Sequence, residues 1–265
     1  MIKGHGTQKE YLENIAREKR TGGFLLCGPE GVGKYTLIQD IAHMHTDAAG
    51  RIFIDAKKQN ISKQTADIIR SLSLLRSQVL RMIVINDAHT MGRDGQNTLL
   101  KILEETPSMT AFFFVSHRPL LLLPTIRSRL HSIRFGLLDI QSTKEILKEK
   151  ECKDVDIRQA VKLYAGQPGK ALSYIDQKDA FSLFSKYLQE EATHKKLMLC
   201  EKMAKILTLP QCIEFFMQYE RKALREGSLD AARKLSELLE LYYDAASYLH
   251  PVMHIQNLCL KYMQP

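Results

Sequence analysis

The amino-acid sequence predicts an α/β base with a mostly parallel sheet, a small helical lid and an all-α C-terminal domain. In the first half of the chain, short apolar runs of strand length alternate with segments whose apolar residues recur at helical spacing. After about residue 136 no further strand pattern follows, and amphipathic helices account for the rest. We therefore expect three parts: a base over residues 1–136, a lid over 137–177 and a helical domain over 178–265.

The expected strands are short and continuously apolar, which is typical of a sheet covered by helices on both faces. They are Gly22–Cys27, Arg51–Asp55, Arg81–Asn86, Ala111–Ser116 and a fifth candidate, Ser132–Phe135. Helical spacing falls between and around them, over Lys9–Lys19, Tyr35–His45, Ile61–Ser77 and Thr98–Glu105. Three short helices are expected within Leu138–Ile175, and longer ones over Asp179–Glu191, Lys195–Leu207, Pro210–Arg225 and Leu229–Tyr248.

The composition is that of an ordinary globular protein, with 45% hydrophobic and 26% charged residues. No apolar run approaches the roughly 20 residues that span a bilayer, and the first residues lack the apolar block of a secretory signal. We therefore expect a cytoplasmic protein without a membrane partner. The five cysteines are scattered without a CxxC pair, so we expect neither disulfides nor a bound metal. The net charge of +8 permits a polyanionic partner without requiring one.

A glycine-rich turn, GPEGVGK, lies between an expected strand and an expected helix. Gly28, Gly31 and Gly33 allow backbone N–H groups to curl round phosphates, and the helix N-terminus adds partial positive charge. Lys34 follows at the spacing at which a lysine reaches the terminal phosphates of a nucleotide. This context predicts a phosphate-binding loop.

The next position should be Ser or Thr, because that hydroxyl coordinates Mg²⁺. Tyr35 stands there, and a phenol is longer and directed differently. Thr36 is one residue further, rotated by about 100° around the helix. We therefore expect a loop that can cradle phosphate but lacks a competent magnesium site.

A second change lies at the end of the expected strand Arg81–Asn86, in the run IVINDAHTM. An active P-loop ATPase needs an Asp here to hold Mg²⁺, usually followed by a Glu that orients water. In one frame Asn86 replaces the metal ligand and Asp87 replaces the Glu. In the frame slipped by one, Asp87 is the metal ligand and Ala88 replaces the base. Either frame predicts crippled hydrolysis.

Three further segments resemble the clamp-loader subunits of the AAA+ family, in the family's order. Gln96–Pro107 (QNTLLKILEETP) is similar to the NALLK-x-LEEPP helix, Leu123–Arg129 (LPTIRSR) to the LLPTIRSRC segment, and Gly166–Leu172 (GQPGKAL) to the lid element GSPGRAL. The resemblance implies a P-loop AAA+ base, a helical lid and a C-terminal collar domain.

Within this family, the altered loop and strand end resemble delta-prime subunits of the bacterial DNA polymerase III clamp loader, which do not hydrolyse ATP. The resemblance implies that Arg129 is an arginine finger that reaches the γ-phosphate in a neighbouring subunit. It places Ser116 at the sensor-1 position and Lys170 at the sensor-2 position. The family's zinc-binding cysteines are absent from this chain.

The same resemblance implies a hetero-oligomer with gamma/tau-type and delta-type subunits that loads a sliding clamp onto primer–template DNA. No cofactor is then required, and ATP or ADP bound without hydrolysis is compatible with that role. Two alternatives stay open: an ATP-hydrolysing gamma/tau-type subunit that tolerates Tyr35 and Asn86, and a stand-alone P-loop DNA-binding protein outside replication.

Overall fold

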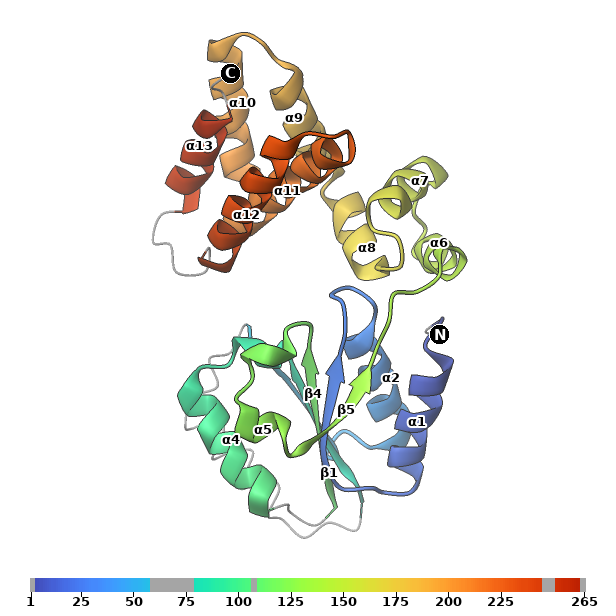
Figure 1. Ribbon diagram of the computed structural model, residues 1–265. Helices are drawn as coiled ribbons and strands as arrows, with labels where there is room; N and C mark the ends of the chain where they lie inside the picture. Colours follow the sequence, from blue (N-terminus) through green and yellow to red (C-terminus); the bar gives the residue numbers. More distant parts are fainter. Residues whose placement is uncertain (1–2, 58–78, 106–108, 245–250, 263–265) are drawn as a thin grey trace. The chain divides into compact units, whose positions relative to one another are not determined.

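The computed structural model describes residues 3–57, 79–105, 109–244 and 251–262. The chain forms two compact units, Met1–Ile175 and Asp176–Pro265 (Figure 1). The helix expected over Ile61–Ser77 lies outside the described residues, as does the end of the helix expected to reach Tyr248. The boundary between base and lid within the first unit stays a prediction.

Five parallel strands form one sheet in the order β2-β3-β4-β1-β5. This confirms the predicted parallel α/β base. The strands are β1 (Gly22–Cys27), β2 (Arg51–Asp55), β3 (Arg81–Asn86), β4 (Thr110–Ser116) and β5 (Leu130–Arg134). The fifth strand therefore begins two residues earlier than expected, because its first residues lie opposite the start of β1, with Gly23 beside Leu130.

Helices cover both faces of this sheet (Figure 1). The described helices of the first unit are α1 (Gly6–Arg17), α2 (Lys34–His45), α4 (Arg93–Glu105), α5 (Pro124–Arg127), α6 (Ile140–Glu149), α7 (Asp154–Leu163) and α8 (Pro168–Asp176), of which the last three do not cover the sheet. Two 3-10 turns, η1 (Ala88–Thr90) and η2 (Pro119–Leu121), lie among them. The observed start of α4 at Arg93 precedes the expected start at Thr98, because the first turn of the helix is polar and shows no apolar periodicity.

The alternation of side chains along β1 separates two apolar clusters. Phe24 packs on one face with Leu12 of α1 and Ile38 of α2. Leu25, the next residue, packs on the other face with Leu99 of α4. This two-residue period is the signature of a strand buried on both sides, as its continuous apolar sequence predicts.

The second unit is all helical, as predicted. Its helices are α9 (Lys178–Gln189), α10 (Thr193–Ile206), α11 (Leu209–Arg225), α12 (Leu229–Asp244) and α13 (Pro251–Lys261). An aromatic cluster lies in its core, where Phe216 meets Phe184 edge-on at 4.8 Å and Tyr262 at 4.3 Å between ring centroids. The last helix was not predicted from the sequence. It begins at Pro251, a residue that is favoured in the first turn of a helix although it interrupts an apolar pattern.

Among the residues that the structure describes, no helix combines the length and the apolar character that crossing a membrane requires.

Phe216→Ala tests the packing of the C-terminal unit. Phe216 is fully buried, and its removal should lower the free energy of unfolding by about 3–5 kcal/mol because a cavity remains. Urea unfolding followed by circular dichroism measures this change. Leu229→Ala is the matched control, because Leu229 is 88% exposed and its loss should change stability by less than about 0.5 kcal/mol. Equal effects of the two substitutions would contradict the described core.

Candidate nucleotide site and arginine surface

The predicted phosphate-binding loop lies between β1 and α2, at the carboxyl end of β1. Gly28, Gly31 and Gly33 have positive φ angles of 147°, 77° and 93°. At Gly28 only glycine fits, because an added Cβ would lie 2.2 Å from the carbonyl oxygen of Phe135. The loop leads directly into α2, which begins at Lys34. A glycine-rich turn that opens a helix is the arrangement that binds phosphate in other proteins.

Lys34 is 5% exposed, and its ammonium group is bound by the loop itself. Nζ donates hydrogen bonds to the carbonyl oxygens of Gly28 (2.8 Å) and Pro29 (2.6 Å). Burial lowers the pKa of Lys34 to about 8, although the carboxylates of Glu30 and Asp87 act in the opposite direction. The group predicted to reach a phosphate is thus paired within the chain.

The lid segment contacts this loop through α8. The backbone N–H of Gly169 donates to the carbonyl oxygen of Gly31 at 2.8 Å. Lys170 Nζ lies 3.1 Å from Glu30 Oε2. Burial acts to raise the pKa of Glu30, but the surrounding cations, led by Lys170, outweigh it and lower that pKa. The predicted sensor-2 residue therefore meets the loop through an ion pair with Glu30.

Tyr35 occupies the position at which a magnesium-binding hydroxyl is needed. Its ring meets Phe53 edge-on, with 6.3 Å between centroids, at the border of the apolar cluster beneath α2. Burial raises the pKa of the Tyr35 phenol, which keeps the group neutral. Thr36 is exposed at the next helical position. The position therefore offers a bulky neutral phenol instead of the small hydroxyl that suits a hard cation.

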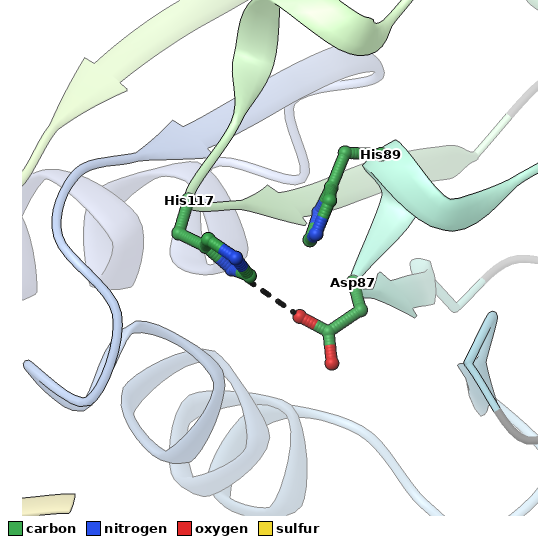
Figure 2. Close-up of side chains that lie close together, drawn as sticks. All are labelled: Asp87, His89 and His117. Carbon is green, nitrogen blue, oxygen red and sulfur yellow. Dashed lines mark ion pairs between the residues drawn. The ribbon is translucent and has the colours of Figure 1, made fainter. Parts of the chain in front are cut away.

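The end of β3 supplies the other predicted site residues. β3 ends at Asn86, and Asp87 follows in a left-handed backbone conformation with φ 48°. Asn86 Nδ2 donates to Asp87 Oδ2 at 3.5 Å. His117 Nδ1 lies 3.7 Å from Asp87 Oδ1 (Figure 2). The interaction with His117 lowers the pKa of Asp87 despite the opposing effect of burial, so this carboxylate is ionised and faces an imidazole.

His117 and its neighbour His89 were not predicted as site residues from the sequence. Both follow strands, His89 in the η1 turn after β3 and His117 directly after β4. Because β3 and β4 are parallel neighbours, their carboxyl ends meet at one edge of the sheet. A sequence signal therefore existed, namely histidines placed just beyond two strand ends.

Ser116 is the last residue of β4 and is 1% exposed. Its Oγ accepts a hydrogen bond from the backbone N–H of Arg118 at 3.0 Å. This bond holds the turn that follows β4 and carries His117. The sensor-1 role of Ser116 stays a prediction.

A pocket of about 580 Å³ lies above the loop and brings most of the predicted site together. The predicted residues that line it are Gly31, Gly33, Lys34, Tyr35, Thr36, Asn86 and Asp87. Four described residues of the predicted set lie outside this lining: Gly28, Ser116, Lys170 and Arg129. The glycine loop and Lys34 fit a phosphate group. The donors around them do not fit the usual magnesium ion, because the hydroxyl and one carboxylate position hold a phenol and an amide.

Arg129 lies in the turn between α5 and β5, and its side chain is 41% exposed. One guanidinium nitrogen lies 2.8 Å from Glu104 Oε1. The other donates to the carbonyl oxygen of Thr125 at 3.0 Å. The two bonds orient an exposed guanidinium that does not line the chain's own pocket.

Comparison with known proteins places these features in context. Residues 45–139 match the family described as DNA polymerase III, delta subunit. The chain is 27% identical over 210 residues to replication factor C subunit 3 of Oryza sativa, covering 73% of this chain and 57% of that protein. It is 36% identical over 103 residues to the DNA polymerase III subunit gamma/tau of Mycobacterium tuberculosis, covering 37% of this chain and 18% of that protein.

The chain is therefore similar, over part of its length, to DNA polymerase III subunits and to a replication factor C subunit. A DNA polymerase III gamma subunit-related protein of Thermotoga maritima has the same fold, with a TM-score of 0.62 at 18% identity over 97% of this chain and all of that one. The RuvB branch migration motor of Thermotoga maritima matches with a TM-score of 0.51 at 19% identity, over 69% of this chain and 64% of that one. The AAA+ fold predicted from the sequence is thereby confirmed.

The lowered pKa of Lys34 is directly testable. We expect acylation of Lys34 by a small amine-reactive reagent, mapped by mass spectrometry, to increase with pH with a midpoint of about 8. In the urea-unfolded chain the midpoint should be near the ordinary value of 10.5. Between these values the unfolded chain binds more protons, so the contribution of Lys34 to stability rises with pH. Equal midpoints in the folded and unfolded chains would contradict the burial of the Lys34 ammonium group and its hydrogen bonds to the loop.

Proposed function

We propose that this chain is a clamp-loader subunit of a replicative DNA polymerase that does not hydrolyse ATP. It supplies Arg129 to an ATP molecule held by a neighbouring subunit during loading of a sliding clamp. The observation that carries this proposal is a contrast between the chain's own pocket and the exposed side chain of Arg129. In the chain's own pocket, Tyr35 and Asn86 replace two of the usual magnesium donors, whereas an oriented guanidinium is exposed outside that pocket.

The arginine part of the proposal rests on chemistry and position. Phosphoryl transfer spreads negative charge over the phosphate oxygens, and a fixed guanidinium stabilises that charge. Arg129 is fixed by Glu104 and by the carbonyl oxygen of Thr125, and it stays accessible from outside. The segment that carries it, LPTIRSR, is the one that resembles the family's arginine-finger motif.

The proposed absence of ATP hydrolysis rests on two independent changes among the residues that would hold the magnesium ion. Tyr35 is packed against Phe53, and Asn86 offers a neutral amide. The glycine loop would hold ATP or ADP without hydrolysis. Its binding would require Lys34 to leave the carbonyl oxygens of Gly28 and Pro29.

The proposed partners follow from the same role. They are gamma/tau-type and delta-type subunits, the sliding clamp and primer–template DNA, which the net charge of +8 suits. The all-helical second unit is the proposed collar through which the subunits assemble, with delta-prime as the proposed subunit type. A cytoplasmic location follows from this role.

An ATP-hydrolysing gamma/tau-type subunit is the second candidate function. The 36% identity to a mycobacterial gamma/tau subunit over 103 residues favours it. It would require Asp87 to hold magnesium although Asn86 replaces the strand-end carboxylate and Tyr35 replaces the Ser or Thr expected after Lys34. Steady-state ATP turnover by the isolated chain separates the two candidates.

Arg129→Ala tests the role in trans. In a loader reconstituted with ATP-active partners, we expect this variant to lower ATP turnover about a thousandfold at the site it serves, because the transition-state charge loses its guanidinium. Arg17→Ala is the control, since Arg17 is also an exposed, carboxylate-paired arginine but lies on α1. Assembly is checked by gel filtration. Unchanged turnover in an assembled Arg129→Ala loader would refute the proposal.

Lys34→Ala tests the idle site. We expect no ATP turnover by the isolated wild-type chain with Mg²⁺, and a loader carrying Lys34→Ala should load clamps at a rate within about twofold of wild type. The same substitution in an ATP-active partner should abolish loading, which shows that the assay detects a working site. A large loss from Lys34→Ala in this chain, with turnover by the wild-type chain alone, would favour the gamma/tau-type alternative.

A further inference from the structure

Three side chains that the proposed function does not use converge at the edge of the pocket. Asp87, His89 and His117 each offer one ligand atom, and these atoms all lie within 4.8 Å of one another. The two imidazole rings meet edge-on, with 4.1 Å between their centroids. Figure 2 shows the three side chains pointing toward one another from two segments, one after β3 and one after β4.

One ring nitrogen of His89 has no hydrogen-bond partner among the described residues. The residue is 9% exposed, and its Nδ1 atom is buried without a hydrogen-bond partner among the described residues. A buried nitrogen without a partner is unfavourable whichever tautomer the ring adopts, because either a donor or a lone pair is left unsatisfied.

We propose that Asp87, His89 and His117 bind one transition-metal ion, with Zn²⁺ as the probe. Two imidazole nitrogens and one carboxylate oxygen are the donors that zinc accepts, whereas magnesium requires oxygen donors. Three protein ligands leave a fourth position open. Asp87 and His117 line the pocket, so that position is reached from it.

Binding of an ion requires the cluster to close, because its ligand atoms are separated by up to 4.8 Å. Ligand atoms in a tetrahedral zinc site lie about 3.3–3.4 Å apart, as follows from metal–ligand distances near 2.0–2.1 Å. Asp87 Oδ1 and His117 Nδ1 are already 3.7 Å apart. The nearby charges have opposite effects on a bound dication. Lys34 and Arg118 disfavour it, whereas the carboxylates of Asp87 and Glu30 favour it.

This site is independent of the role proposed for Arg129, because it concerns ion binding by the single chain. It has a consequence for the pocket. An ion held by Asp87 takes the one carboxylate at the end of β3 that could contribute to a nucleotide-bound magnesium ion. Asp87 would then be a zinc ligand and would not be available to a magnesium ion.

The test uses the full chain, stripped of metal by a chelator and titrated with Zn²⁺ against a chromophoric competitor. We expect one equivalent of Zn²⁺ to bind. His117→Gln and Asp87→Asn should each weaken binding at least tenfold, because each removes a direct ligand. His194→Gln is the control, since His194 is exposed on α10 of the second unit, and it should bind zinc like wild type.

A second measurement identifies the ligands. Co²⁺ should give visible d–d absorption bands of a four-coordinate nitrogen and oxygen site, and His117→Gln should remove them. Circular dichroism checks that the variants fold, and His117 suits substitution because it is only partly buried. Absence of stoichiometric zinc binding would overturn the proposal, as would zinc affinity unchanged by His117→Gln or displacement of zinc by an equal concentration of Mg²⁺. In those cases the cluster is only a histidine–aspartate ion pair beside a second histidine.

Discussion

The parallel pairing of the strands is the constraint on which the site depends. With the order β2-β3-β4-β1-β5 and all pairs parallel, every strand ends at the same edge of the sheet. The glycine loop after β1, Asp87 after β3 and His117 after β4 therefore meet there, although they are far apart in the sequence. The two apolar clusters fix this arrangement, because a shift of one residue in register would turn each strand's core side chains to the wrong face.

Three charged groups at the pocket are paired with other groups of the chain. Lys34 is bound by loop carbonyl oxygens, Lys170 by Glu30, and Asp87 by His117. A loop that cradles phosphate must exchange such internal bonds for bonds to the ligand. The pKa of Lys34 is lowered because burial without a bound phosphate disfavours its charged form.

Local patterns in the sequence predicted most of the fold. The apolar runs predicted β1, β2 and β3 with the observed bounds, because a strand buried on both faces has no polar interruption. The start of α4 and the whole of α13 were missed because a polar first turn and Pro251 hide the helical period. The glycine-rich turn that opens α2 was predictable because its residues are contiguous. The histidine cluster was missed although His89 and His117 each follow a strand, because it forms only when β3 and β4 are neighbours in the sheet.

The contact between Arg129 and Glu104 could not be predicted either, since 25 residues separate the two in sequence. Its energetics suit the proposed role, in which the Arg129 guanidinium exchanges Glu104 for a phosphate. Both side chains are more than 40% exposed, and an ion pair so exposed contributes at most about 1 kcal/mol, because water already solvates both charges. A phosphate bearing several negative charges, approached in a subunit interface from which water is excluded, interacts more strongly than one solvated carboxylate. The Glu104 pair can therefore orient Arg129 in the free chain without preventing its transfer to a neighbour's nucleotide.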